Sequence, residues 1–454
     1  MQNENITILL RMFICFVVLC LLFASCGRER AETTEYYGYD EIHEETYVVY
    51  YEPTVGSALT EMQLLLLEDL DYFLHVMETD FCLFDVQYWA RGVDIRAYVE
   101  IIRSEILNNP NMTADGFFNL LYSQFPHFEP NGLGAHFRLV CRAYYRSIYY
   151  NRAHEHWQSF CFSSLARMSY PHVRAFYSPG RGNIASSLAF ADSPTLTQTP
   201  SRGISIEEGK IAYLHIRNFW NWHDRTLEGF LVFYESIQGY EHLIIDISNN
   251  TGGHVQYFLN AVMQPNISET LHSSAFMFFS MGNYNIEHTA SRIRRNYLGR
   301  YNAFGERISV AELLASYDLP DINMADMERM EYVYRLSAVI TPMRLSRFNY
   351  QPAFDGKIWL LIGSGAVSAG EYAARISKNT GFATLVGERT GGQLGGRRIF
   401  VDLPNTGILF QMDLFYPTDK HGRPFDAGTY PHHFTRPGLT ALETTLQLIA
   451  EGNY

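Results

Sequence analysis

The second half of the chain alternates short, continuously apolar stretches with amphipathic ones, and this alternation constrains the fold more than any other feature. Runs of Leu, Ile and Val this short and this apolar are typical of strands that are buried on both faces. We expect strands at 210–219, 242–248, 273–280, 357–363 and 382–387. Helical patterns around 227–237 and at 368–379 lie between them, and Gly381 stands where a helix C-cap glycine belongs. The pattern predicts an α/β core with a largely parallel sheet.

The first half of the chain shows helical rather than strand periodicity. Between residues 57 and 165 apolar side chains recur every three to four positions, Asn109-Pro110 can end one helix, and Thr113 can cap the next. Turn-forming residues are frequent after that point. We therefore expect three parts, a helical domain over 57–165, a linker over 166–207 and the core over 208–454, in which about 281–345 is a polar, partly helical insertion.

The N-terminus has the pattern of a cleaved secretory signal. Arg11 stands before the apolar run MFICFVVLCLLF, which is short for a membrane span and is followed by Ala24-Ser25-Cys26. The string LFASC looks like a bacterial lipobox, in which Cys26 would carry lipid and become the new N-terminus. We expect a signal peptide over 1–25, an acidic tether over 26–56 and a lipid-anchored protein of the cell envelope outside the cytoplasm. An uncleaved signal anchor is the alternative.

Composition excludes some classes of partner and leaves others open. The net charge is −13 and no long block of Lys or Arg occurs, so the electrostatic footprint of a nucleic-acid-binding protein is missing. Apart from the cysteines of the N-terminal segment, only Cys82, Cys141 and Cys161 remain, an odd number without metal-site spacing, which indicates neither a disulfide framework nor a metal centre. The aromatic content of 15% fits a large aromatic core, or a groove for peptide or sugar.

Three segments of the core carry a family resemblance. They are IIDISNNTGG (244–253), GAVSAGE (365–371) with LVGERTGG (385–392) after it, and LPNTGI (403–408). In this order and spacing the set resembles the tricorn and carboxy-terminal-processing peptidase family over about residues 205–440. The resemblance implies a ClpP/crotonase-like α/β core with an N-terminal helical domain. It also implies a serine endopeptidase that hydrolyses peptides or unfolded proteins through an acyl-enzyme, without a metal or cofactor.

Ser368 is the candidate nucleophile. It directly precedes a predicted helix, where the helix dipole and free N–H groups favour developing negative charge. Ser368 and Glu371 also have the spacing of a capping box, which needs no catalytic role, but the surrounding motif favours the nucleophile. In the processing branch of the family the base is a lysine 25 residues after the serine. Here that position holds Gln393, whose amide cannot accept the proton, so the resemblance is to the tricorn-like branch with a histidine base.

The resemblance also assigns the base and the carboxylate. His136, in the segment NGLGAHFRL (131–139), matches the family's Gly-His segment, with His127 as the next candidate. Asp426 lies 58 residues after the serine, where the family has a glutamate, and would orient the histidine; Asp246 is the competitor. The pair His154 and His156 lacks metal-site spacing and is typical of a solvated helix face.

Backbone amides are needed to bind the oxyanion of an acyl-transfer reaction. The turn at Gly252-Gly253 lets a backbone approach without a Cβ in the way, and with the Ala369 amide it matches the family's oxyanion hole. A tight strand-to-helix turn needs the same glycines.

Two other functions stay open on the sequence alone. Ala135, Gln393 and Asp426 depart from the family pattern, which is what a peptide-binding lipoprotein without activity would show. A surface glycan-binding lipoprotein would account for the aromatic content but not for the segment around Ser368.

Overall fold

The computed structural model describes residues 59–125, 134, 136–150, 167–178, 202–220, 224–280, 282, 303–343, 354–393 and 398–452. Ser57–Tyr454 form one compact unit. The predicted signal peptide, Cys26 and the tether lie outside the described residues, as do most of the predicted linker and His127, Ala135, His154, His156 and Cys161. None of the helices in the described ranges has the length and apolar character that crossing a bilayer requires.

A six-stranded sheet with the order β13-β9-β8-β4-β3-β2 forms the centre of the core. Its strands are β2 (Arg202–Glu207), β3 (Ile211–His215), β4 (His242–Asp246), β8 (Lys357–Ile362), β9 (Thr384–Gly387) and β13 (His433–Phe434). All neighbours pair in parallel except β2, which runs antiparallel to β3 at one edge. The predicted α/β core with a largely parallel sheet is confirmed, and the predicted strands 210–219, 242–248, 357–363 and 382–387 contain β3, β4, β8 and β9.

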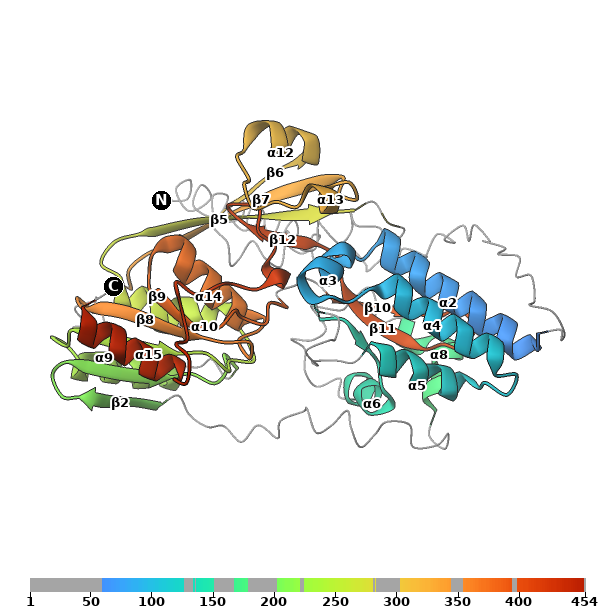
Figure 1. Cartoon of the computed structure of the whole chain (residues 1–454), viewed down its shortest axis with the longest axis horizontal. Coiled ribbons are helices and arrows are strands. Elements are labelled where there is room, and N and C mark those ends of the chain that lie inside the picture. Colours follow the sequence, from blue (N-terminus) through green and yellow to red (C-terminus); the bar gives the residue numbers. More distant parts are fainter. Residues whose placement is uncertain are drawn as a thin grey trace, which may run out of the picture. The chain divides into compact units, whose positions relative to one another are not determined.

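Helices cover both faces of this sheet (Figure 1). Successive side chains of β8 point to opposite faces: Leu360 and Ile362 pack into one apolar cluster, Trp359 and Leu361 into another. The first cluster includes side chains of α9 (Asp224–Ser236), α10 (Val255–Phe258) and α14 (Ala369–Thr380), and the second includes α15 (Ala441–Glu451). Burial on both faces is why these strands are continuously apolar. As predicted, Gly381 ends α14 in the left-handed conformation, with φ 71°.

A second, antiparallel sheet has the order β12-β5-β7-β6. Its strands are β5 (Leu271–Phe279), β6 (Ala303–Ser309), β7 (Tyr332–Ile340) and β12 (Tyr416–Asp419), with α12 (Val310–Ser316) and α13 (Met324–Met327) between β6 and β7. The predicted strand at 273–280 is thus present, but in this sheet rather than in the parallel one. The predicted insertion supplies β6 and β7, two strands that its polar composition does not reveal.

The N-terminal part of the unit is helical, as predicted. Its helices are α2 (Glu61–Thr79), α3 (Phe84–Arg91), α4 (Ile95–Asn108), α5 (Ala114–Gln124), α6 (Arg142–Tyr150) and α8 (Pro171–Tyr177), with a 3-10 turn at Arg167–Ser169. Thr113 caps α5 by accepting a hydrogen bond from the Gly116 amide, and α4 ends before Asn109. The division into a helical domain, a linker and a core stays a prediction.

A small third sheet, β1-β11-β10, ties the helical part to the end of the core. It consists of β1 (Arg138–Leu139), β10 (Arg398–Asp402) and β11 (Leu409–Asp413). β1 pairs antiparallel with β11, with Arg138 opposite Gln411. In an antiparallel pair, the residue two positions before Arg138 faces the residue two positions after Gln411. This register therefore brings position 136 to position 413.

The aromatic residues supply much of the core in the described part of the chain. The largest fully buried side chains include Trp359, Tyr177, Tyr416 and Phe73, and Phe73 packs against three further aromatic rings of the helical part and β11. This burial favours the large aromatic core over an aromatic binding groove. Cys82 and Cys141 are both free and buried.

Candidate active site

Ser368 lies directly before the first residue of α14, in a conformation that is unusual for serine. Its backbone has φ 56° and ψ −117°, and its side chain makes no capping hydrogen bond. Glu371 turns away into a buried cluster instead of closing a capping box. The Ser368 amide donates to the carbonyl of Gly392 at 2.9 Å, which fixes the strained residue from the neighbouring loop. The side chain is thereby kept free of a structural hydrogen bond to its own helix.

His136 lies between Ser368 and a buried aspartate. Its Nε2 is 3.3 Å from Ser368 Oγ, and its Nδ1 is 2.8 Å from Oδ2 of Asp413. Asp413 is fully buried and His136 nearly so. An ionised carboxylate accepts hydrogen bonds only, so the carboxylate favours the tautomer with the proton on Nδ1 and leaves Nε2 as the acceptor for the serine hydroxyl. The three side chains form the hydrogen-bonded series that an activated serine requires.

Backbone strain marks the same place. Within the described ranges, the residues other than glycine with positive φ are His136 (53°), Ser368 (56°) and Gln393 (58°). Such conformations cost on the order of 1–3 kcal/mol each and persist where the surroundings enforce them. Two of them carry the reacting pair, and the third follows the loop that binds the Ser368 amide.

Asp426 occupies a different place from the one predicted for it. It is buried, but its carboxylate accepts hydrogen bonds from Gln87 Nε2 at 2.9 Å, from Arg91 Nε at 3.3 Å and from the Gln393 amide at 3.1 Å. The position against His136 Nδ1, which the sequence assigned to Asp426, is held by Asp413. The physical reason is the pairing of β1 with β11, which sets residue 413 against residue 136 and leaves Asp426 to a neighbouring loop.

Asp426 instead joins the two segments that carry the serine and the histidine. Its partner Gln87, on α3, accepts a hydrogen bond from the Gly134 amide at 2.8 Å, two residues before the histidine. Arg91 of the same helix donates to the Gly391 carbonyl at 2.8 Å. Through α3, the Asp426 carboxylate thus links the histidine segment to the loop behind the serine. Asp246, the other candidate, accepts hydrogen bonds from Tyr213 and from its own turn.

The glycine turn after β4 abuts the nucleophile. A Cβ on Gly252 would lie 2.8 Å from the Cβ of Ser368 and 2.9 Å from the carbonyl oxygen of Val367, and its φ is +85°. The Gly252 amide itself donates to Asn250 Oδ1 at 2.9 Å, so it is not free to bind an oxyanion. The amides of Gly253 and Ala369 donate to no other described group. Of the three predicted oxyanion residues, these two keep an available N–H.

The nearest lysines in the sequence lie away from Ser368. Lys378 Nζ donates to the carbonyl of Tyr430 at 2.7 Å, and Lys420 Nζ contacts the carbonyl of Asn379 at 3.4 Å. The geometry is therefore consistent with a histidine base and offers no lysine in its place among the described residues.

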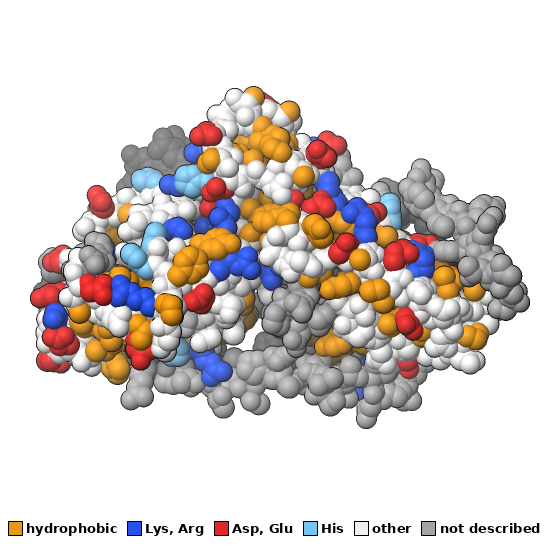
Figure 2. Space-filling model, viewed as in Figure 1, with side chains coloured by type: hydrophobic (Ala, Val, Ile, Leu, Met, Phe, Trp, Pro, Cys, Tyr) orange, Lys and Arg blue, Asp and Glu red, His pale blue; other side chains and the backbone are white. Residues whose placement is uncertain are grey.

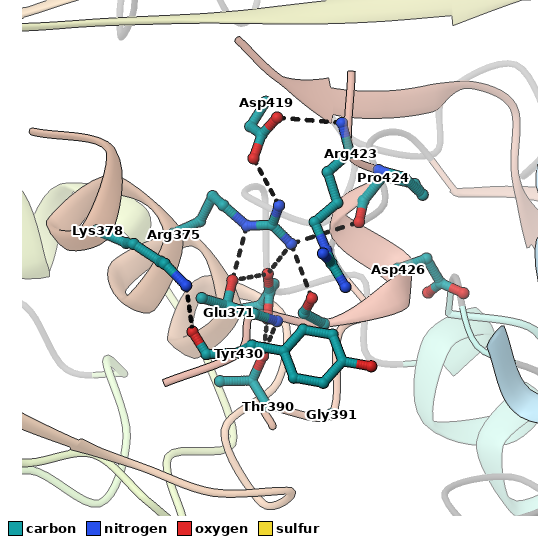
Figure 3. Close-up of polar contacts among 12 residues, drawn as sticks. Glu371, Arg375, Lys378, Thr390, Gly391, Asp419, Arg423, Pro424, Asp426 and Tyr430 are labelled. Atoms are coloured by element: carbon teal, nitrogen blue, oxygen red, sulfur yellow. Dashed lines mark hydrogen bonds and ion pairs between the residues drawn. The ribbon is translucent and has the colours of Figure 1, made fainter. Parts of the chain in front are cut away.

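A buried polar cluster supports the loop behind the serine (Figure 3). Glu371 and Arg375, one turn apart on α14, form an ion pair, and Thr390 and Thr429 both donate to the Glu371 carboxylate. Burial raises the pKa of Glu371, and the Arg375 charge together with the threonine hydroxyls opposes that shift. Figure 3 shows Asp426 outside this cluster, with no contact drawn to it. The cluster fixes Thr390, which leads into Gly391 and Gly392 beside the nucleophile.

An apolar cavity of about 80 Å³ lies between α14 and the antiparallel sheet. Its lining includes Tyr372, whose amide donates to the Ser368 carbonyl, and Val255, which follows the glycine turn. Ala275, Ala338 and Met277 contribute to its other side. The cavity therefore opens along the same helix that begins at the nucleophile.

Sequence reasoning identified Ser368 and His136 but missed Asp413 and Gln87. Asp413 stands alone at the end of an apolar stretch, LFQMD, and this signal would have found it if the pairing of β11 with the histidine segment had been known. Gln87 gives no signal in the sequence, because a glutamine on a helix is ordinary.

Comparisons with solved structures show low sequence identity throughout. Mature CPAF is 14% identical, with 87% of this chain and 96% of that chain covered and a TM-score of 0.47. A lipoprotein from Streptococcus agalactiae is 12% identical, with coverages of 88% and 99% and a TM-score of 0.38. The photosystem II D1 C-terminal processing protease is 17% identical, with coverages of 55% and 52% and a TM-score of 0.30. None of the curated proteins has a significant sequence match to the chain.

The family model is more informative. Peptidase family S41, a family of serine peptidases, matches residues 210–433, which include Ser368 and Asp413. The resemblance drawn from the three motifs is confirmed by this match, although His136 lies before the matched range. The chain therefore belongs to peptidase family S41 through a domain that spans residues 210–433.

Proposed function

We propose that this chain is an active serine endopeptidase, with Ser368 as nucleophile, His136 as general base and Asp413 as the carboxylate that orients the histidine. The observation that carries the proposal is the hydrogen-bonded series from Ser368 Oγ to His136 Nε2 at 3.3 Å and from His136 Nδ1 to Asp413 at 2.8 Å. A distance of 3.3 Å is slightly long, as catalytic hydrogen bonds often are before substrate binds.

The reaction follows from these positions. Ser368 Oγ attacks the peptide carbonyl carbon while its proton passes to His136 Nε2, and the carbonyl oxygen takes up the negative charge. The amides of Gly253 and Ala369 are the donors we assign to that oxyanion, with the positive end of α14 behind it. The C–N bond then breaks, and the leaving amine takes the proton from Nε2. Water attacks the resulting ester by the reverse transfers and releases the acid.

The buried Asp413 suits the charged state of this cycle. When Nε2 holds the serine proton, the imidazole is positive, and a fully buried carboxylate at 2.8 Å compensates that charge. Oδ1 of Asp413 has no hydrogen-bond partner among the described groups, so little else weakens the interaction.

For the substrate we propose peptides or unfolded proteins with an apolar side chain near the cleaved bond. The cavity beside α14 is lined largely by apolar side chains, and its volume of about 80 Å³ suits a side chain of the size of Val, Leu or Met. The lipobox at Cys26 supports attachment to the membrane by lipid, with the peptidase outside the cytoplasm. No metal or cofactor is part of the proposed mechanism.

The test compares four proteins: the unmodified protein, Ser368→Ala, His136→Ala and the double variant. If the two residues act as one unit, each single change lowers kcat by several orders of magnitude and the double variant is hardly worse. A fluorophosphonate probe labels the unmodified protein at Ser368, and Ser236→Ala, at an exposed helix position, is the control that keeps labelling and turnover.

The same experiment separates the proposal from a peptide-binding protein of the same fold. Absence of probe labelling together with tight binding of peptides that stay intact would select the inactive lipoprotein. Ser368→Asp, which fits a helix cap but cannot be acylated in the same way, should be folded and inactive. A fully active Ser368→Asp protein would contradict the nucleophile.

A further inference from the structure

A second, polar cavity lies at the other end of the nucleophile helix. It has a volume of about 280 Å³ and includes Lys378 and Asn379, near the C-terminal end of α14, in its lining. The remaining walls come from the segment that follows β12 and from the loop that ends at His432. Figure 2 shows Lys, Arg and His side chains gathered on this face of the molecule, over the place where Figure 1 labels α14 and β12.

The lining carries an excess of positive charge on an otherwise acidic chain. Its four cationic side chains are Arg375, Lys378, Lys420 and Arg423, and its two carboxylates are Asp321 and Asp419, with His421 and His432 also present. With the histidines neutral this leaves two positive charges, although the chain as a whole carries −13.

The carboxylates do not neutralise the cations that face the cavity. Asp419 accepts hydrogen bonds from Arg375 Nη1 at 2.7 Å and from the backbone amides of His421 and Arg423, so it is fully used within its own turn. Asp321 is exposed at the rim. Arg375 is further paired with Glu371.

The other three cations have donors to spare. Lys378 uses one of its three protons on the Tyr430 carbonyl, and Lys420 contacts only a backbone carbonyl. Arg423 lies 4.5 Å above the Tyr430 ring, and its buried Nε has no hydrogen-bond partner (Figure 3). No ion pair of these three side chains occurs in the described part of the chain. A buried donor without an acceptor is costly, so an acceptor from outside the chain would be stabilising here.

The protonation of Lys378 points the same way. Its pKa is lowered, first by burial and then by the neighbouring charges of Arg375 and Arg423, an effect that Asp419 and Asp321 only partly oppose. Positive charge therefore outweighs negative charge at its Nζ. A bound anion would relieve this repulsion and accept the unused protons.

We propose that this cavity is a binding site for a dianionic oxyanion of the phosphate type, held by Lys378, Arg423 and Lys420. Two unpaired positive charges match a dianion, and Arg and Lys donors suit its oxygens. The cavity is larger than a single phosphate ion, so a phosphoryl group on a larger molecule also fits. The site is separate from the reacting groups, because the nucleophile lies at the opposite end of α14.

The experiment uses the full chain with Ser368→Ala, so that its outcome is independent of peptidase activity. Inorganic phosphate is titrated by calorimetry and by thermal unfolding, against sodium chloride at matched ionic strength, and O-phosphoserine is titrated in parallel. We expect phosphate to bind and to raise the Tm where chloride does not. Binding of O-phosphoserine as well assigns a phosphoryl group carried by a larger ligand, and binding of phosphate alone assigns the free ion.

Variants identify the place of binding. Arg423→Gln and Lys378→Gln should each weaken the affinity on the order of tenfold, the effect of losing one charge-assisted hydrogen bond. Lys420→Gln, a change at an exposed side chain that leaves the fold intact, should weaken it several-fold. Lys210→Gln, a lysine outside the cavity, is the matched control and should change nothing. Equal affinity in all four variants, or a Tm shift that chloride reproduces, would overturn the proposal.

Discussion

Replacing Asp413 by asparagine distinguishes the catalytic carboxylate seen in the structure from the one predicted by the sequence. Asparagine keeps the shape of the side chain but can present an NH2 group to His136 Nδ1. That contact favours the tautomer with the proton on Nε2, which cannot accept the Ser368 proton. The buried negative charge that compensates the imidazolium is lost as well.

The expected magnitude follows from the burial of this contact. Asp413 is fully buried and its Oδ2 is 2.8 Å from Nδ1, so water cannot replace the missing charge. The corresponding change in another serine protease lowers kcat about 10⁴-fold. We expect Asp413→Asn to lower kcat by about 10³–10⁴, which is a barrier increase of about 4–5.5 kcal/mol, with little change in KM.

Asp426→Asn is the matched comparison. One of its oxygens becomes an NH2 group that faces the donors of Gln87 and Arg91 or the Gln393 amide, so the cost is mainly one of stability, about 1–3 kcal/mol. Turnover per folded molecule should fall much less than for Asp413→Asn. The assay is steady-state cleavage of an unstructured protein at a fixed concentration of folded enzyme, checked by circular dichroism. The reverse ranking, with Asp426→Asn the more damaging to kcat, would refute the reasoning.

Three further changes test other features. Burial raises the pKa of Asp326 to about 6, against hydrogen bonds from Tyr416 and Trp89 that lower it. Because the folded state holds this proton more tightly than the unfolded state, the group stabilises the fold below about pH 4 and that contribution, about 2–3 kcal/mol, is lost as the pH rises through 6; urea unfolding should show a shallower loss for Asp326→Asn. Ala338→Phe should fill the apolar cavity and reduce cleavage beside Leu or Met more than beside Ala, as mass spectrometry of the products would show. Cys26→Ser should release the protein from the membrane fraction, and unchanged membrane association and mass would indicate a signal anchor.

The central sheet could be predicted from the sequence because its strands are buried on both faces. Trp359 and Leu360 point to opposite clusters, and each needs an apolar residue. The antiparallel sheet could not be predicted as readily. β6 and β7 contain polar and charged residues, such as Arg307 and Arg335, and their pairing depends on contacts between distant parts of the chain.

Prediction of the site was limited in the same way. Ser368 and the glycine turn lie in local motifs, so a sequence pattern identifies them. The partner of His136 is decided by a two-residue strand that pairs with a segment more than 250 residues later, and no local pattern contains that register. Asp426 was predicted because it has the expected distance from the serine in sequence, whereas the distance that matters is the one across the β1–β11 pair.

That short β1–β11 pairing makes the active site a product of two stretches of chain that are synthesised at different times. His136 is made early, Ser368 much later, and Asp413 only when 413 of the 454 residues exist. A growing chain therefore has a histidine without its carboxylate, and then a serine whose base is not yet oriented. The core alone, without the helical part, would have nucleophile and carboxylate but no base. On the mechanism proposed, activity would begin only in a nearly complete and folded chain, so unfinished or truncated copies would be unable to cut their neighbours.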